Sequence, residues 1–497
     1  MRPGWRSLEP VAAGALLVTA FAPLGWFPLA YILPALLFYR WSEASPASAA
    51  RQGFLFGLGL FGAGASWVYV SVHEFGNMPA PMAAFFVFLF ICYLALFPAM
   101  AGWLQARLAP AGLARLVFAA PAAWVLFEWL RGWLMTGFPW LHLGYTQTGS
   151  PLMNLAPLTG VYGMSYLTAL LAALLVVVIR QAAVPRLVAV SLLTLTLAVS
   201  WYAGRLEFVK PAGEMFRVAL VQANIPLSEK WRPGAVLPIS HIYRDLSHAV
   251  VEQSSLIVWP EGAIPESWQQ NEQIVMQRLP TRKDGSRPDY LLGSIDMSPG
   301  QDYYNAAIGL SDTVSIYRKQ HLVPFGEFLP FSPLLGWLIN YLHIPMSDFS
   351  AWQQPQEAPI LAGHPAGVNI CYEDAFGEEI IAAARTSSYL VNLSEDAWFG
   401  DSLALPQRLQ MARVRARETG RSFLRAANTG ITAVITPDGE ISARLEPFQR
   451  AVLTASVVPM SGLTPYVRFG NLPVLLLLTA SLLLAVMSGR RQRARES

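Results

Sequence analysis

The chain has 497 residues, which is too long for one ordinary hydrophobic core, so the sequence predicts at least two domains. Apolar residues make up 54% and charged residues only 13%, a composition that argues against an average water-soluble protein. The net charge of +3 is too small to indicate a nucleic-acid partner.

The acidic residues divide the chain into an apolar part and a soluble part. All but five of the 32 lie between residues 204 and 468. We therefore predict a transmembrane bundle of seven spans at 1–203, a catalytic domain outside the cytoplasm at 204–468, an eighth transmembrane helix at 469–489 and a basic cytoplasmic tail at 490–497.

Apolar runs in the first and last parts predict an α-helical transmembrane bundle of about eight spans. The runs lie at 8–24, 26–39, 53–72, 80–104, 116–134, 160–179, 187–203 and 469–487. A helix needs about 20 apolar residues to cross a bilayer, and the first two runs are shorter than that.

Arginines in alternate loops indicate the orientation of this bundle. Loops 73–79 and 135–158 contain no Lys or Arg, whereas the other loops are flanked by Arg40, Arg51, Arg107, Arg115, Arg180 and Arg186. By the positive-inside rule the basic loops are cytoplasmic, so the first two runs together make an even number of crossings. This parity places 204–468 on the outer side of the membrane and the tail inside.

The soluble part reads as alternating strands and helices. We expect strands at 216–225, 254–264, 289–295, 305–310, 314–319, 367–372, 389–394 and 422–428, a hairpin at 432–441, and helices at 268–279, 376–386 and 406–420. Nearly continuous apolar strands between helices are typical of a sheet covered on its faces by helices.

Three of these strands end in residues that can do chemistry together. Glu261 ends an apolar strand in VWPEGAIP, Lys319 another in YRKQHLVPFGE, and Cys371 a third in NICYEDAF. A thiol becomes a strong nucleophile only when it loses its proton, which a carboxylate can accept. An ammonium nearby favours the thiolate and can stabilise the oxyanion that forms when sulfur attacks a carbonyl.

The segments WPEGAIP, YRKQHLVPFGE and NICYEDAF resemble, in order, the three motifs of the nitrilase superfamily. With spans on both sides, nearly the whole chain resembles more closely the membrane-embedded branch of that superfamily, the bacterial apolipoprotein N-acyltransferases. The resemblance implies an α/β nitrilase-like αββα sandwich beside the helical bundle. It also implies Glu261 as general base, Lys319 as oxyanion stabiliser and Cys371 as nucleophile.

The resemblance assigns further positions with less specificity. Supporting residues of the site are Glu327, Tyr372, Glu373 and Asn305, and residues that line the acyl or lipid pocket are Trp231, Trp398 and Phe399. The implied reaction is a ping-pong transfer of an acyl chain from a phospholipid, through a thioester on Cys371, to the α-amine of a diacylglyceryl apolipoprotein. The implied location is the bacterial cytoplasmic (inner) membrane, with the catalytic domain on the periplasmic side, and no cofactor is implied.

Two other functions stay open at this point. The first is a membrane-anchored nitrilase-type amidase that hydrolyses a small amide, although such an enzyme needs only one anchor. The second is a transporter with an outer regulatory domain, which would need charged or broken helices along a path. Apart from Glu128 and Arg131, three residues apart in or near a span, few residues offer such charges. For these two residues a structural role or a headgroup contact are the alternatives.

Several other features also carry expectations. Cys92 lies in an apolar run and should pack there without pairing with Cys371. His321 offers an alternative Cys–His pair. The uncharged segments 328–346 and 133–150 are expected to guide acyl chains, with an ordinary buried helix pair as the alternative for 328–346. No cluster of His or Cys has metal-ligand spacing.

Overall fold

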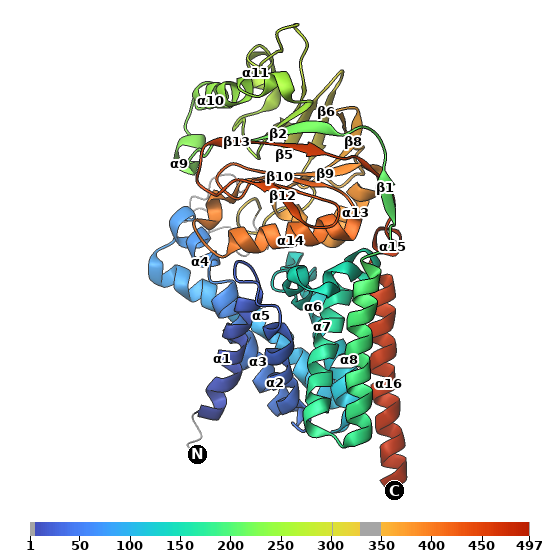
Figure 1. The fold of residues 1–497 in the computed structure, drawn as a ribbon. Helices are drawn as coiled ribbons and strands as arrows, with labels where there is room; N and C mark the ends of the chain where they lie inside the picture. The colour runs from blue at the N-terminus through green and yellow to red at the C-terminus, as the bar shows by residue number, and fades with distance from the viewer. Residues whose placement is uncertain (1–4, 301, 329–348, 497) are drawn as a thin grey trace. The chain divides into compact units, whose positions relative to one another are not determined.

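The computed structural model describes residues 5–300, 302–328 and 349–496. By their contacts these residues form two units. One comprises Met1–Tyr69, Pro79–Glu207 and Arg468–Ser497, and the other comprises Val70–Met78 and Phe208–Val467. The first unit is helical and the second combines strands with helices (Figure 1). Segment 70–78 therefore groups with the strands, although helices of the helical unit precede and follow it in sequence.

In the helical unit, three helices approach one another closely because glycines replace side chains between them. The longer helices of this unit are α1 (Trp5–Leu17), α2 (Leu29–Trp41), α3 (Pro46–Gly64), α5 (Ala80–Leu108), α6 (Ala120–Arg131), α7 (Ala156–Arg180), α8 (Ala183–Ala203) and α16 (Leu472–Glu496). A Cβ on Gly59 of α3 would lie 1.9 Å from the carbonyl oxygen of Val11 in α1. A Cβ on Gly53 of α3 would lie 2.2 Å from the carbonyl oxygen of Pro98 in α5. Small residues of this kind allow apolar helices to pack backbone against backbone.

Four helices of the described chain are long and apolar enough to cross a membrane. They are Ala80–Leu108, Pro151–Arg180, Ala183–Ala203 and Leu472–Arg491. A fifth candidate is the bent pair Pro46–Gly64 and Val68–Phe75, whose axes differ by 61°. The prediction of a membrane part is thus supported, but for four or five spans instead of eight.

The shortfall arises because an apolar run does not show where a helix ends. Helices α1 and α2 have 13 residues each, and α6 has 12. The first apolar run changes to 3₁₀ geometry at Val18–Ala20, and the run at 116–134 begins with a π-helical turn at Arg115–Ala119. Each of these helices is shorter than the roughly 20 residues that a straight crossing needs.

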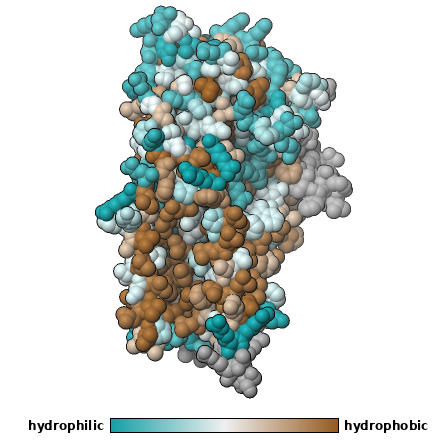
Figure 2. Space-filling view, turned by 90° about the vertical axis from the view of Figure 1, so that its right-hand side faces the viewer, coloured by the Kyte–Doolittle hydropathy of each residue, from teal (hydrophilic) through white to brown (hydrophobic). Residues whose placement is uncertain are grey.

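The surface of the helical unit is rich in exposed apolar side chains. On α8, Leu187 and Trp201 are 69% and 59% exposed, and on α16 Leu476 is 60% exposed. Figure 2 shows hydrophobic residues gathered over the helical unit on the face that it displays. Large exposed apolar patches are typical of surfaces that contact a membrane or another protein. The helical unit is therefore suited to lipid.

The second unit contains two six-stranded sheets. The first has the order β13-β2-β3-β4-β5-β6 and the second the order β12-β11-β10-β9-β8-β7. The strands of the first sheet are β2 (Phe216–Gln222), β3 (Leu256–Trp259), β4 (Asp289–Met297), β5 (Tyr303–Leu310), β6 (Val314–Arg318) and β13 (Ala451–Val457). Those of the second are β7 (Ile360–Leu361), β8 (His364–Ile370), β9 (Tyr389–Ser394), β10 (Phe423–Ala427), β11 (Ala433–Ile435) and β12 (Ile441–Arg444). Strands β2, β3 and β4 run parallel, as do β8, β9 and β10.

Alternation along the strands produces the layers of this unit. Val218 and Leu220 of β2 join a core that the two sheets share, whereas Ala219 and Val221 face the opposite side. That outer face is covered by α10 (Val236–His248) and α11 (Trp268–Met276). The outer face of the second sheet is covered by α13 (Gly377–Thr386) and α14 (Ala404–Thr419). The predicted αββα sandwich is confirmed (Figure 1).

The strands and helices expected in this unit are present with small shifts at their ends, and several further elements, among them helix α10 and strand β13, were not predicted. Helix α10 has the sequence VLPISHIYRDLSH, in which a proline, two serines and β-branched residues weaken the helical pattern. Packing of Ile239 and Tyr243 against the first sheet stabilises this helix. Strand β13 was also not predicted, and it pairs with β2 in antiparallel register over seven residues.

Candidate active site

Three side chains predicted to act together stand just beyond the ends of three strands. Glu261 follows β3, Lys319 follows β6 and Cys371 follows β8. The exposed fractions of these residues are only 8%, 1% and 6%. Lys319 Nζ lies 3.6 Å from Glu261 Oε1, and the thiol interacts electrostatically with both charged groups. The site thus combines residues from both sheets of the sandwich.

The backbone turns sharply at Cys371. Its φ of 50° lies in the left-handed region, and a 3₁₀ turn, Cys371–Ala375, begins there. Its carbonyl oxygen accepts hydrogen bonds from Arg408 Nη2 at 2.7 Å and from Asn392 Nδ2 at 3.1 Å. A residue other than glycine costs on the order of 1–3 kcal/mol in this conformation, and such strain concentrates at functional sites. The surrounding contacts hold the sulfur at a fixed turn.

Asn305, on β5, joins the two carboxylates that surround Lys319. Its Nδ2 donates to Glu261 Oε1 at 2.7 Å and to Glu327 Oε1 at 2.9 Å. Lys319 Nζ lies 2.8 Å from Glu327 Oε2, which also accepts from the backbone N–H of Val323. One ammonium therefore sits between two carboxylates whose own orientation is fixed by hydrogen bonds.

These charges define the protonation of the site. Burial lowers the pKa of Lys319, but Glu327, Glu261 and Cys371 outweigh this effect, so its pKa lies above the ordinary value. Burial raises the pKa of Cys371 to about 12, and Glu261 adds to this, while Arg408 and Lys319 oppose it. At neutral pH the lysine is charged and the cysteine is a thiol, so the sulfur needs a base.

Glu373 connects the turn at the sulfur to the segment that follows Lys319. Its Oε1 accepts a hydrogen bond from the backbone N–H of Gln320 at 2.7 Å. Its Oε2 accepts one from the backbone N–H of Ile370 at 2.6 Å and one from Tyr317 Oη at 3.0 Å. Burial raises the pKa of Glu373 to about 7. Its neighbour Tyr372 packs edge-on against Phe376, with ring centroids 5.0 Å apart. Glu373 thus holds the ends of two strands together.

The three aromatic residues expected at the substrate pocket have different surroundings. A Cβ on Gly262, next to Glu261, would lie 3.8 Å from Trp231, so this ring stands beside the site. Phe399 lies below the Arg408 guanidinium, 5.8 Å from its carbon. Trp398 instead packs edge-on against Phe75 at 5.9 Å. Trp231 and Phe399 thus neighbour residues that contact the predicted triad.

Lys230 and Glu395 also contact the site, and neither was predicted from the sequence. The backbone N–H of Glu395 donates to Glu261 Oε2 at 2.7 Å. Lys230 Nζ donates to the Glu261 carbonyl oxygen at 2.8 Å and forms an ion pair with the Glu395 carboxylate. Both lie in segments of which only the aromatic residues were expected at the site, SEKW and EDAWFG, although each segment carries charges beside an apolar strand.

A buried cluster of two arginines and two aspartates was also missed. Arg408 pairs with Asp374 at 3.0 Å and Asp396 at 2.5 Å, and Arg425 pairs with the same two at 3.1 and 2.5 Å. Arg408 Nη1 also lies 3.7 Å from Cys371 Sγ. Helix α14 and strand β10 supply the arginines, and no spacing in the sequence places these two elements beside the cysteine.

The alternative Cys–His pair is not formed. His321 Nδ1 lies 2.6 Å from Glu379 Oε1, and its ring stacks on Phe376 with centroids 3.8 Å apart. Cys92 and Cys371 are both free thiols. Among the described residues no group of three His, Cys, Asp or Glu side chains is placed to hold a metal ion.

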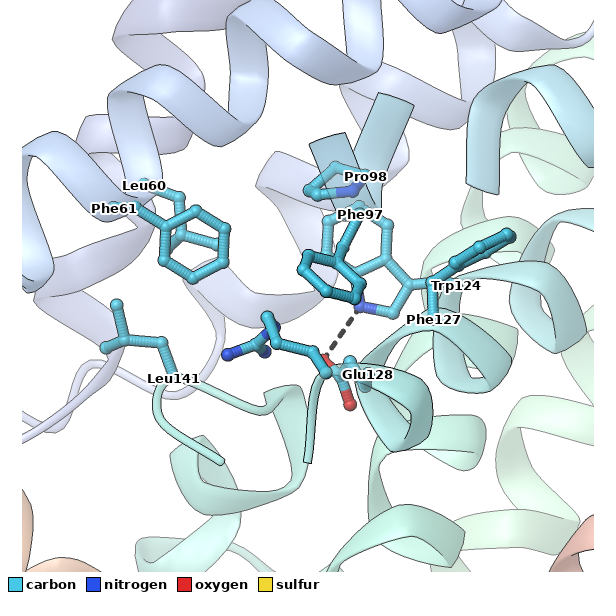
Figure 3. A pocket seen from close by; sticks show the side chains of 9 residues that line it. Leu60, Phe61, Phe97, Pro98, Trp124, Phe127, Glu128 and Leu141 are labelled. Atoms are coloured by element: carbon cyan, nitrogen blue, oxygen red, sulfur yellow. Dashed lines mark hydrogen bonds between the residues drawn. The ribbon is translucent and has the colours of Figure 1, made fainter. Parts of the chain in front are cut away.

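Glu128 and Arg131 make hydrogen bonds to other segments of the helical unit. Glu128 Oε1 accepts from Trp124 Nε1 and from the backbone N–H of Leu143, both at 2.9 Å. Arg131 Nη1 donates to the carbonyl oxygens of Phe138 and Trp140 at 2.9 and 2.5 Å. Figure 3 shows Glu128 at a small pocket lined mainly by apolar rings. The contacts support the structural role that was one of the alternatives.

The two uncharged segments have different outcomes. Residues 329–348 lie outside the described part of the chain, so the predicted apolar arm at 328–346 is not tested. In segment 133–150, Trp140 and Leu143 are buried within the helical unit. Only its first residues, Trp133, Leu134 and Met135, present large apolar side chains at the surface.

Comparison with known proteins identifies the family. Residues 217–466 match the carbon-nitrogen hydrolase family, and residues 13–174 match the apolipoprotein N-acyltransferase N-terminal domain. The apolipoprotein N-acyltransferase of Methylococcus capsulatus is 43% identical over 470 residues, which cover 94% of this chain and 93% of that protein. That of Nitrosomonas europaea is 43% identical over 501 residues, covering 98% and 99%. The chain therefore belongs to the apolipoprotein N-acyltransferase family.

Proposed function

We propose that this protein transfers an acyl chain from a phospholipid to the α-amine of the N-terminal diacylglyceryl-cysteine of an apolipoprotein. The observation that carries the proposal is the buried group of Glu261, Lys319 and Cys371, with Lys319 between two carboxylates. The relatives that cover nearly the whole chain carry the name apolipoprotein N-acyltransferase, which agrees with this chemistry.

In the first half-reaction Cys371 becomes acylated. Glu261 accepts the thiol proton as sulfur attacks the carbonyl carbon of the phospholipid ester. The C–S bond forms and the carbonyl oxygen becomes an oxyanion, which the Lys319 ammonium stabilises. When the C–O bond breaks, Glu261 returns the proton to the departing alcohol, and a lysophospholipid leaves. The enzyme retains the chain as a thioester.

In the second half-reaction the amine of the lipoprotein attacks the thioester. An α-amine has a pKa near 8, so about a tenth is neutral and nucleophilic at pH 7. Glu261 accepts the proton that the attacking nitrogen loses, Lys319 again stabilises the oxyanion, and the C–S bond breaks. The thiolate recovers the proton, and the product carries a stable amide.

Fixed charges around Lys319 suit it to both half-reactions. Glu327 and Asn305 are positioning residues for Lys319 and Glu261, because their hydrogen bonds hold both charged groups in one arrangement. Glu373 positions the turn at Cys371, and we place Tyr372 beside the reacting carbonyl. Donors that are already oriented contribute a few kcal/mol each to a transition state, since they do not reorganise during the reaction.

Location in the cytoplasmic membrane follows from the same proposal. We assign 1–203 to the transmembrane bundle, 204–468 to a catalytic domain on the periplasmic side, and 469–489 to the last transmembrane helix, with 490–497 in the cytoplasm. Support comes from the four apolar helices and from the arginines in alternate loops. A site at the outer leaflet can admit two lipid substrates and exclude water, which would hydrolyse the thioester.

Intact mass spectrometry tests the acyl-enzyme. Purified wild-type protein exposed to a phospholipid of defined chain length should gain the mass of one acyl group, which neutral hydroxylamine removes. Cys371→Ala should gain none. No adduct on the wild type, or the same adduct on Cys371→Ala, would contradict the mechanism. Release of free fatty acid with an apolipoprotein present would favour a hydrolase instead.

A further inference from the structure

The side chain of Arg408 reaches the nucleophilic sulfur from the interior of the domain. Its Nη1 is 3.7 Å from Cys371 Sγ, within hydrogen-bond range for sulfur, and its Nη2 is 2.7 Å from the carbonyl oxygen of the same residue. Arg408 is 1% exposed, so water does not screen this contact. A guanidinium keeps its charge at every pH at which a protein is folded.

The cluster around Arg408 fixes the position of this charge. Arg408 and Arg425 both pair with Asp374 and Asp396, which gives two positive and two negative charges in one buried group. Buried ions persist only when they are paired and hydrogen-bonded, and a planar guanidinium between two carboxylates has little freedom to turn. The N–H that faces the sulfur is therefore aimed before any substrate binds.

Four charged groups act on the sulfur of Cys371, and they come from different elements. Glu261 and Lys319 follow strands of the first sheet, Arg408 comes from α14, and Asp396 comes from the 3₁₀ turn Asp396–Phe399. Lys319 is held between Glu261 and a second carboxylate, whereas Arg408 donates to the sulfur itself. The two cations thus contact different partners.

We propose that Arg408 is a catalytic residue that stabilises the thiolate of Cys371, while Lys319 stabilises the carbonyl oxygen. This division of roles rests on the proposed acyl transfer. Negative charge builds up on sulfur twice, when Glu261 removes the thiol proton and when the C–S bond of the tetrahedral adduct breaks. A hydrogen bond from Arg408 lowers the energy of the sulfur anion at both points, and no bond to Arg408 itself forms or breaks.

Arg425 offers a matched control, because it belongs to the same cluster and its hydrogen bonds go elsewhere. Its Nη1 and Nη2 donate to Asp374, Asn392, Ser394 and Asp396. Arg408→Gln and Arg425→Gln each remove one of the two guanidinium groups from the same two aspartates. Only Arg408→Gln removes the donor to Cys371.

The test is the rate at which iodoacetamide alkylates Cys371 in the full-length protein, in a Cys92→Ser background, as a function of pH. Below the thiol pKa this rate follows the thiolate fraction. Arg408→Gln should be alkylated about tenfold more slowly than the parent at about pH 8, with the profile shifted to higher pH by about one unit. Arg425→Gln should stay within about threefold of the parent, although both variants lose thermal stability to a similar extent.

Equal slowing in both variants would overturn the proposal, since the effect would then belong to the cluster as a whole. An unchanged profile in Arg408→Gln would overturn it too. If Arg408→Gln does not fold, the same measurement is made on Arg408→Lys and Arg425→Lys. Only Arg408→Lys should slow the alkylation of Cys371, and identical pH profiles of the two variants would contradict the proposal. If the wild type is acylated on Cys371 but the alkylation profile of Arg408→Gln is unchanged, the proposed role of Arg408 is wrong and the proposed acyl transfer still stands.

Discussion

At the scale of single residues, the charges of the site converge on Lys319. It is buried, and it lies 2.8 Å from one carboxylate and 3.6 Å from another. Burial alone would favour a neutral amine, so the two carboxylates are what keep the ammonium charged. The same carboxylates are hydrogen-bonded to Asn305. The site therefore depends on the balance of one positive and two negative charges more than on any one contact.

Glu327→Gln tests this balance. The amide keeps the shape and one acceptor for Lys319 but removes a negative charge, so the pKa of Lys319 should fall and the lysine should move toward Glu261. We expect acyl-enzyme formation to slow by about 10- to 100-fold while the protein stays folded. Stopped-flow or quench measurement of acylation checks this, with the exposed Glu357→Gln as the control. A variant with the wild-type rate would show that Glu327 does not tune the lysine.

Glu373 provides a prediction about stability and pH. Its carboxyl has an ordinary pKa of 4.5 in an unfolded chain and about 7 in the folded protein. Between these values folding takes up a proton, so the contribution of Glu373 to stability is full below about pH 4.5 and is lost as the pH rises through about 7. The melting temperature of Glu373→Gln minus that of the wild type should therefore increase over this interval and level off above it. A difference that falls with rising pH would contradict the assignment.

At the scale of elements, the sequence was informative wherever the function lies at a strand end. Glu261, Lys319 and Cys371 each follow a short apolar strand, so pattern and position pointed to the same residues. Arg408 could not be found in this way, because its role depends on how α14 packs against the second sheet. The number of membrane spans was overestimated for a related reason. Composition locates apolar segments, but it does not show that α1, α2 and α6 end after 12 or 13 residues.

The close packing of α1, α3 and α5 makes a prediction at this scale. Gly59→Ala would place a methyl carbon 1.9 Å from the Val11 carbonyl oxygen, so α1 and α3 must separate. Gly62 lies in the same helix, and a methyl carbon added there would meet no atom of a neighbouring element within 4 Å. We expect Gly59→Ala to lower stability by about 1–3 kcal/mol and Gly62→Ala to have little effect. Thermal denaturation in detergent compares the two, and equal melting temperatures would contradict the helix contact.

At the scale of the whole molecule, the chain combines an apolar helical unit with an αββα sandwich whose site is buried. The apolar surface of α8 and α16 is suited to lipid (Figure 2), and the basic loops indicate which side of the membrane faces the cytoplasm. The proposed acyl transfer would use both units, since an apolar surface suits lipid substrates and a buried site would protect a thioester from water. The strand pattern predicted a sheet covered by helices, whereas the two-sheet αββα sandwich was implied by the resemblance to the nitrilase superfamily. The pattern does not show which face of β2 meets the second sheet, which the packing of its alternate side chains into two cores decides.

The orientation can be tested with single cysteines in a Cys92→Ser, Cys371→Ala background. Asp312→Cys lies at an exposed turn of the catalytic domain, and Ala182→Cys lies at an exposed position between α7 and α8. A membrane-impermeant maleimide added to spheroplasts should label Asp312→Cys, and it should label Ala182→Cys only after lysis, because that loop carries arginines. The reverse labelling pattern would place the catalytic domain in the cytoplasm.

The most direct test of acyl transfer through Cys371 is a single-turnover chase. Acyl-enzyme is prepared with a phospholipid, freed of that lipid, and mixed with a synthetic peptide whose N-terminal cysteine carries a diacylglyceryl group and a free α-amine. The protein should lose one acyl mass while the peptide gains the same mass as a hydroxylamine-resistant amide, and an N-acetylated peptide should gain none. Acylation of the peptide only when phospholipid is present, with the adduct on Cys371 unchanged, would contradict acyl transfer through Cys371.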